Sequence, residues 1–231
     1  MGPYPQNYGL PPTRTWRESL GAQGETRYAT TEIRTQGVRW HPADASAAVA
    51  LVSGGGLTVG MSSHLIATGL DQAVALVQSI SADQLELPTP CTDWNVRDLT
   101  NHLVNSSAQM AVMAQGGQPD WASLSDHHDE PAPVLRQAAD DIVAALGSGD
   151  SKAPEGMLAS EIAVHTWDLA TALGRDTNEL DPALAELGHE FMSKSLTPDN
   201  RGDAFKPEQQ ASEGANAYER LAAFAGRSVP G

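Results

Sequence analysis

The chain has 231 residues, of which 40% are hydrophobic and 19% are charged, and its formal net charge is −15. This acidity argues against partners such as nucleic acid or an anionic membrane surface, because binding to either needs a basic face. The chain has one cysteine, which allows no intramolecular disulfide, and it shows neither an apolar run long enough to span a bilayer nor a signal-peptide pattern. We therefore expect a cytoplasmic protein of about one domain.

Residues 1–60 differ in charge and pattern from the rest of the chain. They hold five arginines and four acidic residues, for a net charge of +1, whereas residues 61–231 hold nine basic and 25 acidic residues, for −16. The first 40 residues are rich in proline and polar residues and lack any helical or strand periodicity. We predict a disordered leader over 1–60, with Met61 as the natural start of an over-extended gene, and a folded domain over 61–231.

Apolar residues recur with the helical period from Met61 onward, and no alternating strand pattern interrupts them. The pattern predicts four main helices, at about 62–80, 94–116, 131–146 and 154–173. A shorter helix is expected from Asp181-Pro182 and another at 216–225, after the bundle. The predicted fold class is therefore an all-α four-helix bundle with short extra C-terminal helices.

Two of the apolar rows contain a histidine. His102 lies in the row of the second helix and His165 in that of the fourth, where Glu161 precedes it by one turn on the same face. An inward glutamate is costly unless it is paired or bound to a metal, and bundles build metal sites from Glu and His on facing helices. Three such ligands would leave a coordination position open, as in catalytic zinc sites.

Spacing alone leaves other interpretations of these residues open. Each histidine can be a core residue with a single hydrogen bond, and Glu161 can form a helical ion pair with protonated His165. Two histidines and one carboxylate also describe the iron site of non-haem oxygenases. The missing strand pattern argues against a β-barrel oxygenase.

Other residue types that can carry chemistry have simpler interpretations. Cys91 precedes a helix start, which can activate a thiol, but a packing role in a proline-rich turn fits it better. We interpret His127 and His128 as part of a solvated loop and His189 as a surface residue.

Residues beside the three candidate ligands have two interpretations each. Trp94 and Trp167 are better explained as packing anchors than as substrate platforms. Asp168 follows His165 by three residues, so it either orients that imidazole or takes a plain surface or helix-pair role. Asn105, one turn after His102, is a weaker candidate for lining the same cavity.

The sequence around these residues resembles a known family. Residues 89–103 read Thr-Pro-Cys-Thr-Asp-Trp-Asn-Val-Arg-Asp-Leu-Thr-Asn-His-Leu, and residues 161–170 read Glu-Ile-Ala-Val-His-Thr-Trp-Asp-Leu-Ala. Both blocks resemble signatures of an actinobacterial family related to the N-terminal domain of mycothiol-dependent maleylpyruvate isomerase, within the DinB-like metalloenzyme superfamily. The tail, including Gly226-Arg227, also resembles the way members end, so the resemblance covers about residues 62–227.

This resemblance implies a DinB-like bundle that holds one divalent metal, zinc in our expectation, through His102, Glu161 and His165. It implies an enzyme whose nucleophile is a water or a thiol activated by the metal, with mycothiol as a possible co-substrate. The expected partner is a small anionic metabolite or low-molecular-weight thiol, for which Arg201 or Arg220 would supply positive charge, in a monomer or homodimer. The alternative is a non-catalytic metal-binding bundle with a stress or regulatory role.

Overall fold

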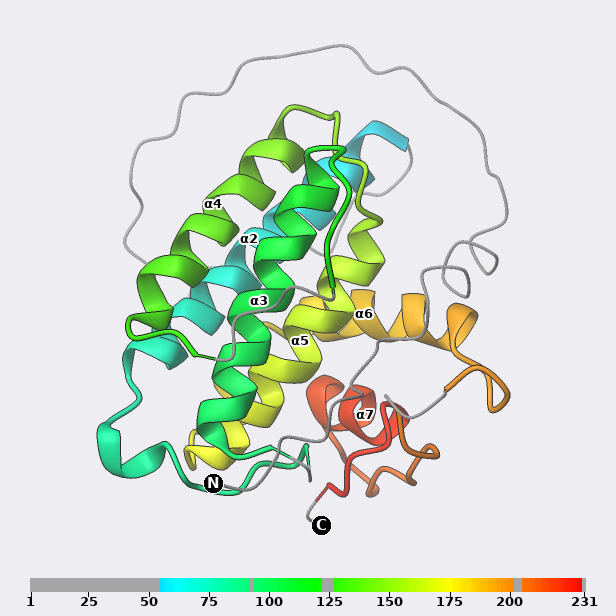
Figure 1. Cartoon of the computed structure of the whole chain (residues 1–231). Coiled ribbons are helices and arrows are strands. Elements are labelled where there is room, and N and C mark those ends of the chain that lie inside the picture. Colours follow the sequence, from blue (N-terminus) through cyan, green and yellow to red (C-terminus); the bar gives the residue numbers. More distant parts are fainter. Residues whose placement is uncertain (1–54, 92–93, 122–126, 202–204, 230–231) are drawn as a thin grey trace.

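The computed structural model describes residues 55–91, 94–121, 127–201 and 205–229. Over these ranges the chain forms six α-helices and no strand, which confirms the predicted all-α fold (Figure 1). The helices are α2 (Gly55–Gln78), α3 (Val96–Ala114), α4 (Pro131–Gly147), α5 (Glu155–Ala172), α6 (Pro182–Ser195) and α7 (Ala217–Phe224).

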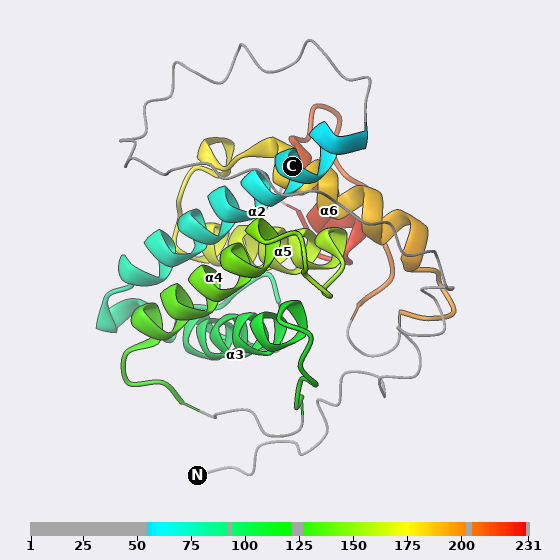
Figure 2. The ribbon, with the colours of Figure 1, turned by 90° about the horizontal axis from the view of Figure 1, so that it is seen from above.

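The four long helices, α2 to α5, form the bundle, and the two shorter ones pack on its side. Helix α3 packs against α4, and α2 contacts both α4 and α5 (Figures 1 and 2). Helix α6 packs along α5, and α7 contacts both of them. Helix α5 therefore touches α2, α3, α6 and α7, so its side chains meet residues from distant parts of the chain.

Helix α2 begins at Gly55, earlier than the expected start near residue 62. Glycine costs about 1 kcal/mol in a helix but keeps its N–H group and does not block the helix as proline would. The helix can therefore extend backward through Gly55, Gly56 and Gly60. Residues 1–54, where the rest of the disordered leader was predicted, lie outside the described residues.

The predicted apolar rows form the core of the bundle. Seven of their large side chains are fully buried: Ile66, Leu70, Leu99, Leu103, Leu158, Ile162 and Leu169. The contact between α5 and α6 is especially close at Gly188, where a Cβ atom would lie 2.8 Å from the Cα of Ser160. This close contact holds α6 against the segment of α5 that carries Glu161.

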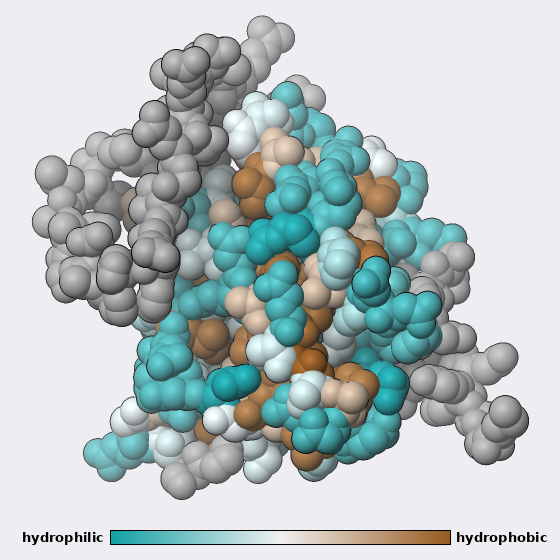
Figure 3. Space-filling view, turned by 90° about the vertical axis from the view of Figure 1, so that its left-hand side faces the viewer, coloured by the Kyte–Doolittle hydropathy of each residue, from teal (hydrophilic) through white to brown (hydrophobic). Residues whose placement is uncertain are grey.

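The surface of the bundle is largely polar. The face shown in Figure 3 is mostly hydrophilic, with narrow hydrophobic areas between the polar ones. Among the described helices, none combines the length and the apolar character that crossing a bilayer would require.

Candidate metal centre

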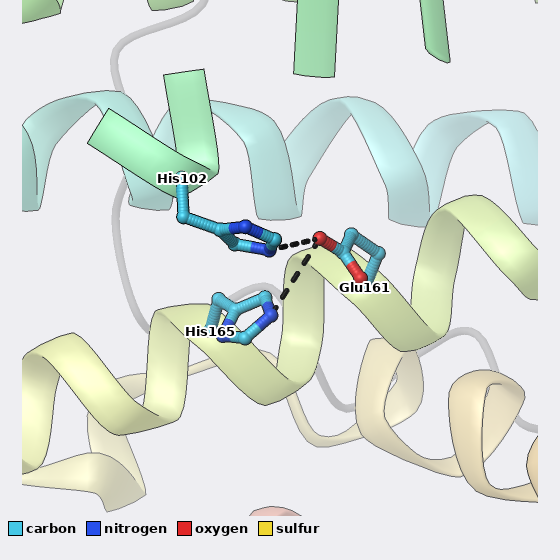
Figure 4. A group of neighbouring side chains, drawn as sticks. All are labelled: His102, Glu161 and His165. Atoms are coloured by element: carbon cyan, nitrogen blue, oxygen red, sulfur yellow. Dashed lines mark hydrogen bonds and ion pairs between the residues drawn. The ribbon is translucent and has the colours of Figure 1, made fainter. Parts of the chain in front are cut away.

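His102, Glu161 and His165 converge on one point between α3 and α5 (Figure 4). The Nε2 atom of His102 lies 3.0 Å from Oε1 of Glu161, and Nε2 of His165 lies 3.5 Å from the same oxygen. One ligand atom from each residue lies within 4.8 Å of the other two. The structure thus brings together the three residues that the sequence singled out, in an arrangement that could hold a metal ion.

The loop before α3 places a tryptophan against both imidazoles. The hydroxyl of Thr89 donates to the carbonyl oxygens of Trp94, at 2.8 Å, and Cys91, at 3.0 Å, which closes the proline-rich turn. The ring of Trp94 then lies 4.4 Å from the ring of His102 and 6.0 Å from that of His165, measured between centroids. Trp94 therefore restricts the motion of both histidines.

The environment favours the ionisation states that a metal requires. The side chains of His102 and Glu161 are 21% and 22% exposed. Burial lowers the pKa of His102, although its hydrogen bond to Glu161 opposes this effect. Burial would raise the pKa of Glu161, but His165 and His102, with help from Ser106, lower it well below its usual range. A carboxylate and a neutral imidazole are the forms that coordinate metals.

Asp168 and Arg227 lie directly behind His165. The carboxylate of Asp168 has no exposed surface, and its Oδ2 atom lies 3.2 Å from Nδ1 of His165. Arg227, whose side chain is 7% exposed, donates to the same oxygen through Nη2 at 2.9 Å. Burial would raise the pKa of Asp168, but Arg227 and His165 together hold it below its usual value. Asp168 is therefore buried and pairs with His165 one turn away on the same helix, so a plain surface role is wrong.

Acid is expected to destabilise the protein without added metal through Asp168. Because its pKa is lower in the folded than in the unfolded state, the unfolded chain binds more protons. The stabilisation is complete above about pH 5 and is lost as the pH falls through about 4 and below. Urea denaturation between pH 7 and pH 3 should therefore show a falling free energy of unfolding. The Asp168→Asn variant should have a lower free energy of unfolding at pH 7 but should lose less of it on acidification. If both proteins lost the same free energy of unfolding between pH 7 and pH 3, Asp168 would not be the cause of the acid destabilisation.

A small cavity lies beside Glu161 and His165. Its volume is about 20 Å³, and its lining residues are Ser160, Glu161, Val164, His165, Met192 and Phe205. A cavity of this size has room for about one water molecule. Its walls come from α5, α6 and the C-terminal segment (residues 205–229). These three parts of the chain therefore line the side of the centre at which a further ligand could enter.

Three further histidines of the described chain, His127, His128 and His189, have other neighbours and are not part of the converging group. His127 is exposed and pairs with an aspartate in its own loop. The Nε2 atom of His128 lies 3.0 Å from Oδ1 of Asn105, so Asn105 contacts the loop that carries His128. Asn105 is not among the residues that line the cavity beside Glu161. His189 packs edge-on against Phe224, with ring centroids 5.1 Å apart.

The structure places neither predicted arginine near the centre but brings a third one there. Arg201 donates to two carbonyl groups of the C-terminal segment, and Arg220 pairs with Glu186 on α6. Arg227 was missed because it follows the last helix, outside any periodic pattern. The only signal in the sequence was the Gly226-Arg227 pair in the part of the tail that resembles the family.

Comparison with known proteins identifies the family to which this chain is related. Residues 66–155 match the model of the mycothiol maleylpyruvate isomerase N-terminal domain, a range that contains His102 and ends before Glu161. Uncharacterized proteins from two strains of Mycobacterium tuberculosis, CDC 1551 and H37Rv, are each 33% identical over 173 residues. Each alignment covers 69% of this chain and 93% of the relative. No solved structure gives a significant match.

Proposed function

Because this chain belongs to the family of the mycothiol maleylpyruvate isomerase N-terminal domain, we propose that it is a metal-dependent enzyme. Its centre would consist of His102, Glu161 and His165, and its reaction would activate a thiol or a water molecule. The substrate would be a small, anionic metabolite or a thiol conjugate, with mycothiol as the co-substrate that the family name suggests. We expect this chemistry in the cytoplasm.

The observation that carries this proposal is the spacing of the three ligand atoms. Zinc binds nitrogen and oxygen ligands at about 2.0–2.2 Å, so neighbouring ligands of a tetrahedral site lie about 3.3 Å apart. The two nitrogen–oxygen distances, 3.0 and 3.5 Å, lie on either side of this value. The donor set of two imidazoles and one carboxylate also suits zinc and leaves a fourth position for an exogenous ligand.

A divalent ion bound here would act as a Lewis acid and lower the pKa of a thiol or water molecule. Glu161 offsets one of the two positive charges, which leaves a local charge of +1 within a strongly acidic domain. Trp94 restrains the imidazoles, while Met192 and Phe205 form apolar walls that limit the entry of water. These residues would bind and orient a small ligand at the open side.

One observation favours the alternative, a non-catalytic metal-binding bundle. The cavity beside the ligands has a volume of only about 20 Å³, which suits a water molecule better than a metabolite. In that case the ion would stabilise the fold, and the centre would take no substrate.

Metal analysis and ligand exchange on the full chain distinguish the two functions. For an enzyme we expect about one equivalent of zinc, and the absorption spectrum of the cobalt-substituted protein should change when azide or a thiol is added. A screen for thiol-dependent activity would follow. The non-catalytic bundle is indicated if the chain unfolds on chelation and the cobalt spectrum does not change when azide or a thiol is added. A chain that binds no divalent metal would contradict both functions.

A further inference from the structure

We infer that Arg227, beyond the last helix, is a positioning residue for the metal centre, acting through Asp168 on His165. This inference rests on the proposed function, because the imidazole that it orients is one of the proposed ligands. It assigns to the C-terminal segment, residues 205–229, a part in building the centre as well as in covering the bundle.

The first step is the contact between Asp168 and His165. The Oδ2 atom of Asp168 lies 3.2 Å from Nδ1 of His165, where it would accept the Nδ1–H of the ring. This hydrogen bond would fix the tautomer and the rotation of the ring and leave the lone pair of Nε2 available to a metal beside Glu161. Such partners of ligand histidines commonly change metal affinity 10- to 100-fold when they are lost.

The second step is the ion pair between Asp168 and Arg227. A carboxylate with no exposed surface is costly without a cation, and Arg227 supplies one through Nη2 at 2.9 Å and Nε at 3.3 Å. The remaining Nη1 group donates to the carbonyl oxygen of Ala225 at 3.1 Å, which fixes the guanidinium from its other side. Arg227 therefore holds Asp168 both ionised and in place.

The third step is the turn that aims Arg227 at α5. Two residues after α7 stands Gly226 at φ +88, whose N–H donates to the carbonyl oxygen of Ala223, while the N–H of Arg227 donates to that of Ala222. This is a Schellman motif, which satisfies the last carbonyls of a helix and reverses the chain. A Cβ atom at Gly226 would lie 2.5 Å from the carbonyl oxygen of Lys206, so only glycine fits the turn.

The same segment reaches the centre a second time. Phe205 lines the small cavity together with Glu161 and His165. The C-terminal segment thus contacts the centre from the cavity side through Phe205 and supports His165 from behind through Arg227 and Asp168.

A purely structural role for Arg227 is the interpretation to be tested, and the chain offers a matched control. Arg201 is also buried, at 8% exposure, and it also holds the C-terminal segment by donating to the carbonyls of Lys206 and Phe224. It contacts neither Asp168 nor the three ligands in the described structure. Arg201→Met therefore removes a comparable buried cation and should leave the contacts from Arg227 to Asp168 and from Asp168 to His165 in place.

The test measures zinc affinity and the tautomer of His165 in the full-length protein. Zinc affinity is determined by competition with a chromophoric chelator, and urea denaturation of the zinc-free protein gives the folded fraction for correction. We expect Arg227→Met to weaken zinc binding about 10-fold or more and Arg227→Lys to restore part of the loss. Arg201→Met should keep the wild-type affinity. In a double-mutant cycle, Arg227→Met should have little further effect in the Asp168→Asn background.

A second readout needs no metal. Long-range proton–nitrogen spectra of the zinc-free protein at pH 8 should show His165 with its proton on Nδ1 in the wild type and a tautomer mixture in Arg227→Lys and Arg227→Met. Wild-type zinc affinity in folded Arg227 variants, or an equal loss in Arg201→Met, would overturn the inference. If the wild type binds no zinc, the proposed function fails, and the tautomer of His165 still decides whether Arg227 positions the ring.

Discussion

Replacing His102 with alanine is expected to abolish zinc binding at the centre. The substitution removes one of the three proposed ligands and leaves Glu161 and His165, which lie on one helix and would not complete the site. Because loss of even an indirect partner costs 10- to 100-fold in affinity, loss of a ligand should weaken binding by more than about 100-fold. Metal analysis of the purified variant, followed by zinc titration, measures the effect.

His127→Ala is the matched control for this variant. His127 is exposed, pairs with Asp129 in its own loop and is not among the three converging side chains, so its loss should leave zinc stoichiometry and affinity unchanged. Full retention of zinc by His102→Ala would refute the proposed ligand set, because α5 alone would then suffice. The remaining explanation for the convergence would be a pair of hydrogen bonds that Glu161 makes with two imidazoles.

Replacing Trp167 with alanine is expected to lower the free energy of unfolding by about 3–5 kcal/mol. Trp167 is 2% exposed and belongs to the larger core cluster, so its loss leaves a cavity under the helix that carries Glu161 and His165. Urea denaturation of the zinc-free protein measures this change. The zinc affinity of the folded fraction should change much less than in His102→Ala, because Trp167 contacts the core and is no ligand.

Trp167→Phe keeps most of the buried area and serves as the control. Among the described residues, the indole Nε1 atom of Trp167 has no hydrogen-bond partner, so replacement by phenylalanine removes no hydrogen bond. This variant should be clearly more stable than Trp167→Ala. An alanine variant as stable as the wild type would show that Trp167 is not the packing anchor that both the sequence and its burial indicate.

The helices and the three candidate ligands were predictable because their signals are local in the chain. A helical period places Leu99, His102 and Leu103 on one face whatever the partner helix is, and the four-residue interval between Glu161 and His165 fixes their relation within α5. Proline at the start of α4 and Gly174 after α5 marked boundaries that the structure reproduces within a residue or two. The early start of α2 was not predictable, because glycine weakens a helix without stopping it.

The supporting residues could not be predicted, because they depend on contacts between distant parts of the chain. The interval from His102 to Glu161 and that from Asp168 to Arg227 are both 59 residues, and no sequence period specifies either contact. Arg201, Arg220 and Arg227 look alike in sequence, yet only the packing of α7 against α5 decides which one is buried beside the centre.

The sequence by itself determined an acidic, all-α chain with two histidines and a glutamate in otherwise apolar rows, since helical periodicity and charge are properties of short segments. The tertiary structure decided that these three side chains meet, that Trp94 lies against the two imidazoles and that the C-terminal segment contacts Asp168 beside His165. The angles and distances at which helices pack are set by the whole core, so the sequence of α3 and α5 alone does not determine whether His102 reaches Glu161 and His165.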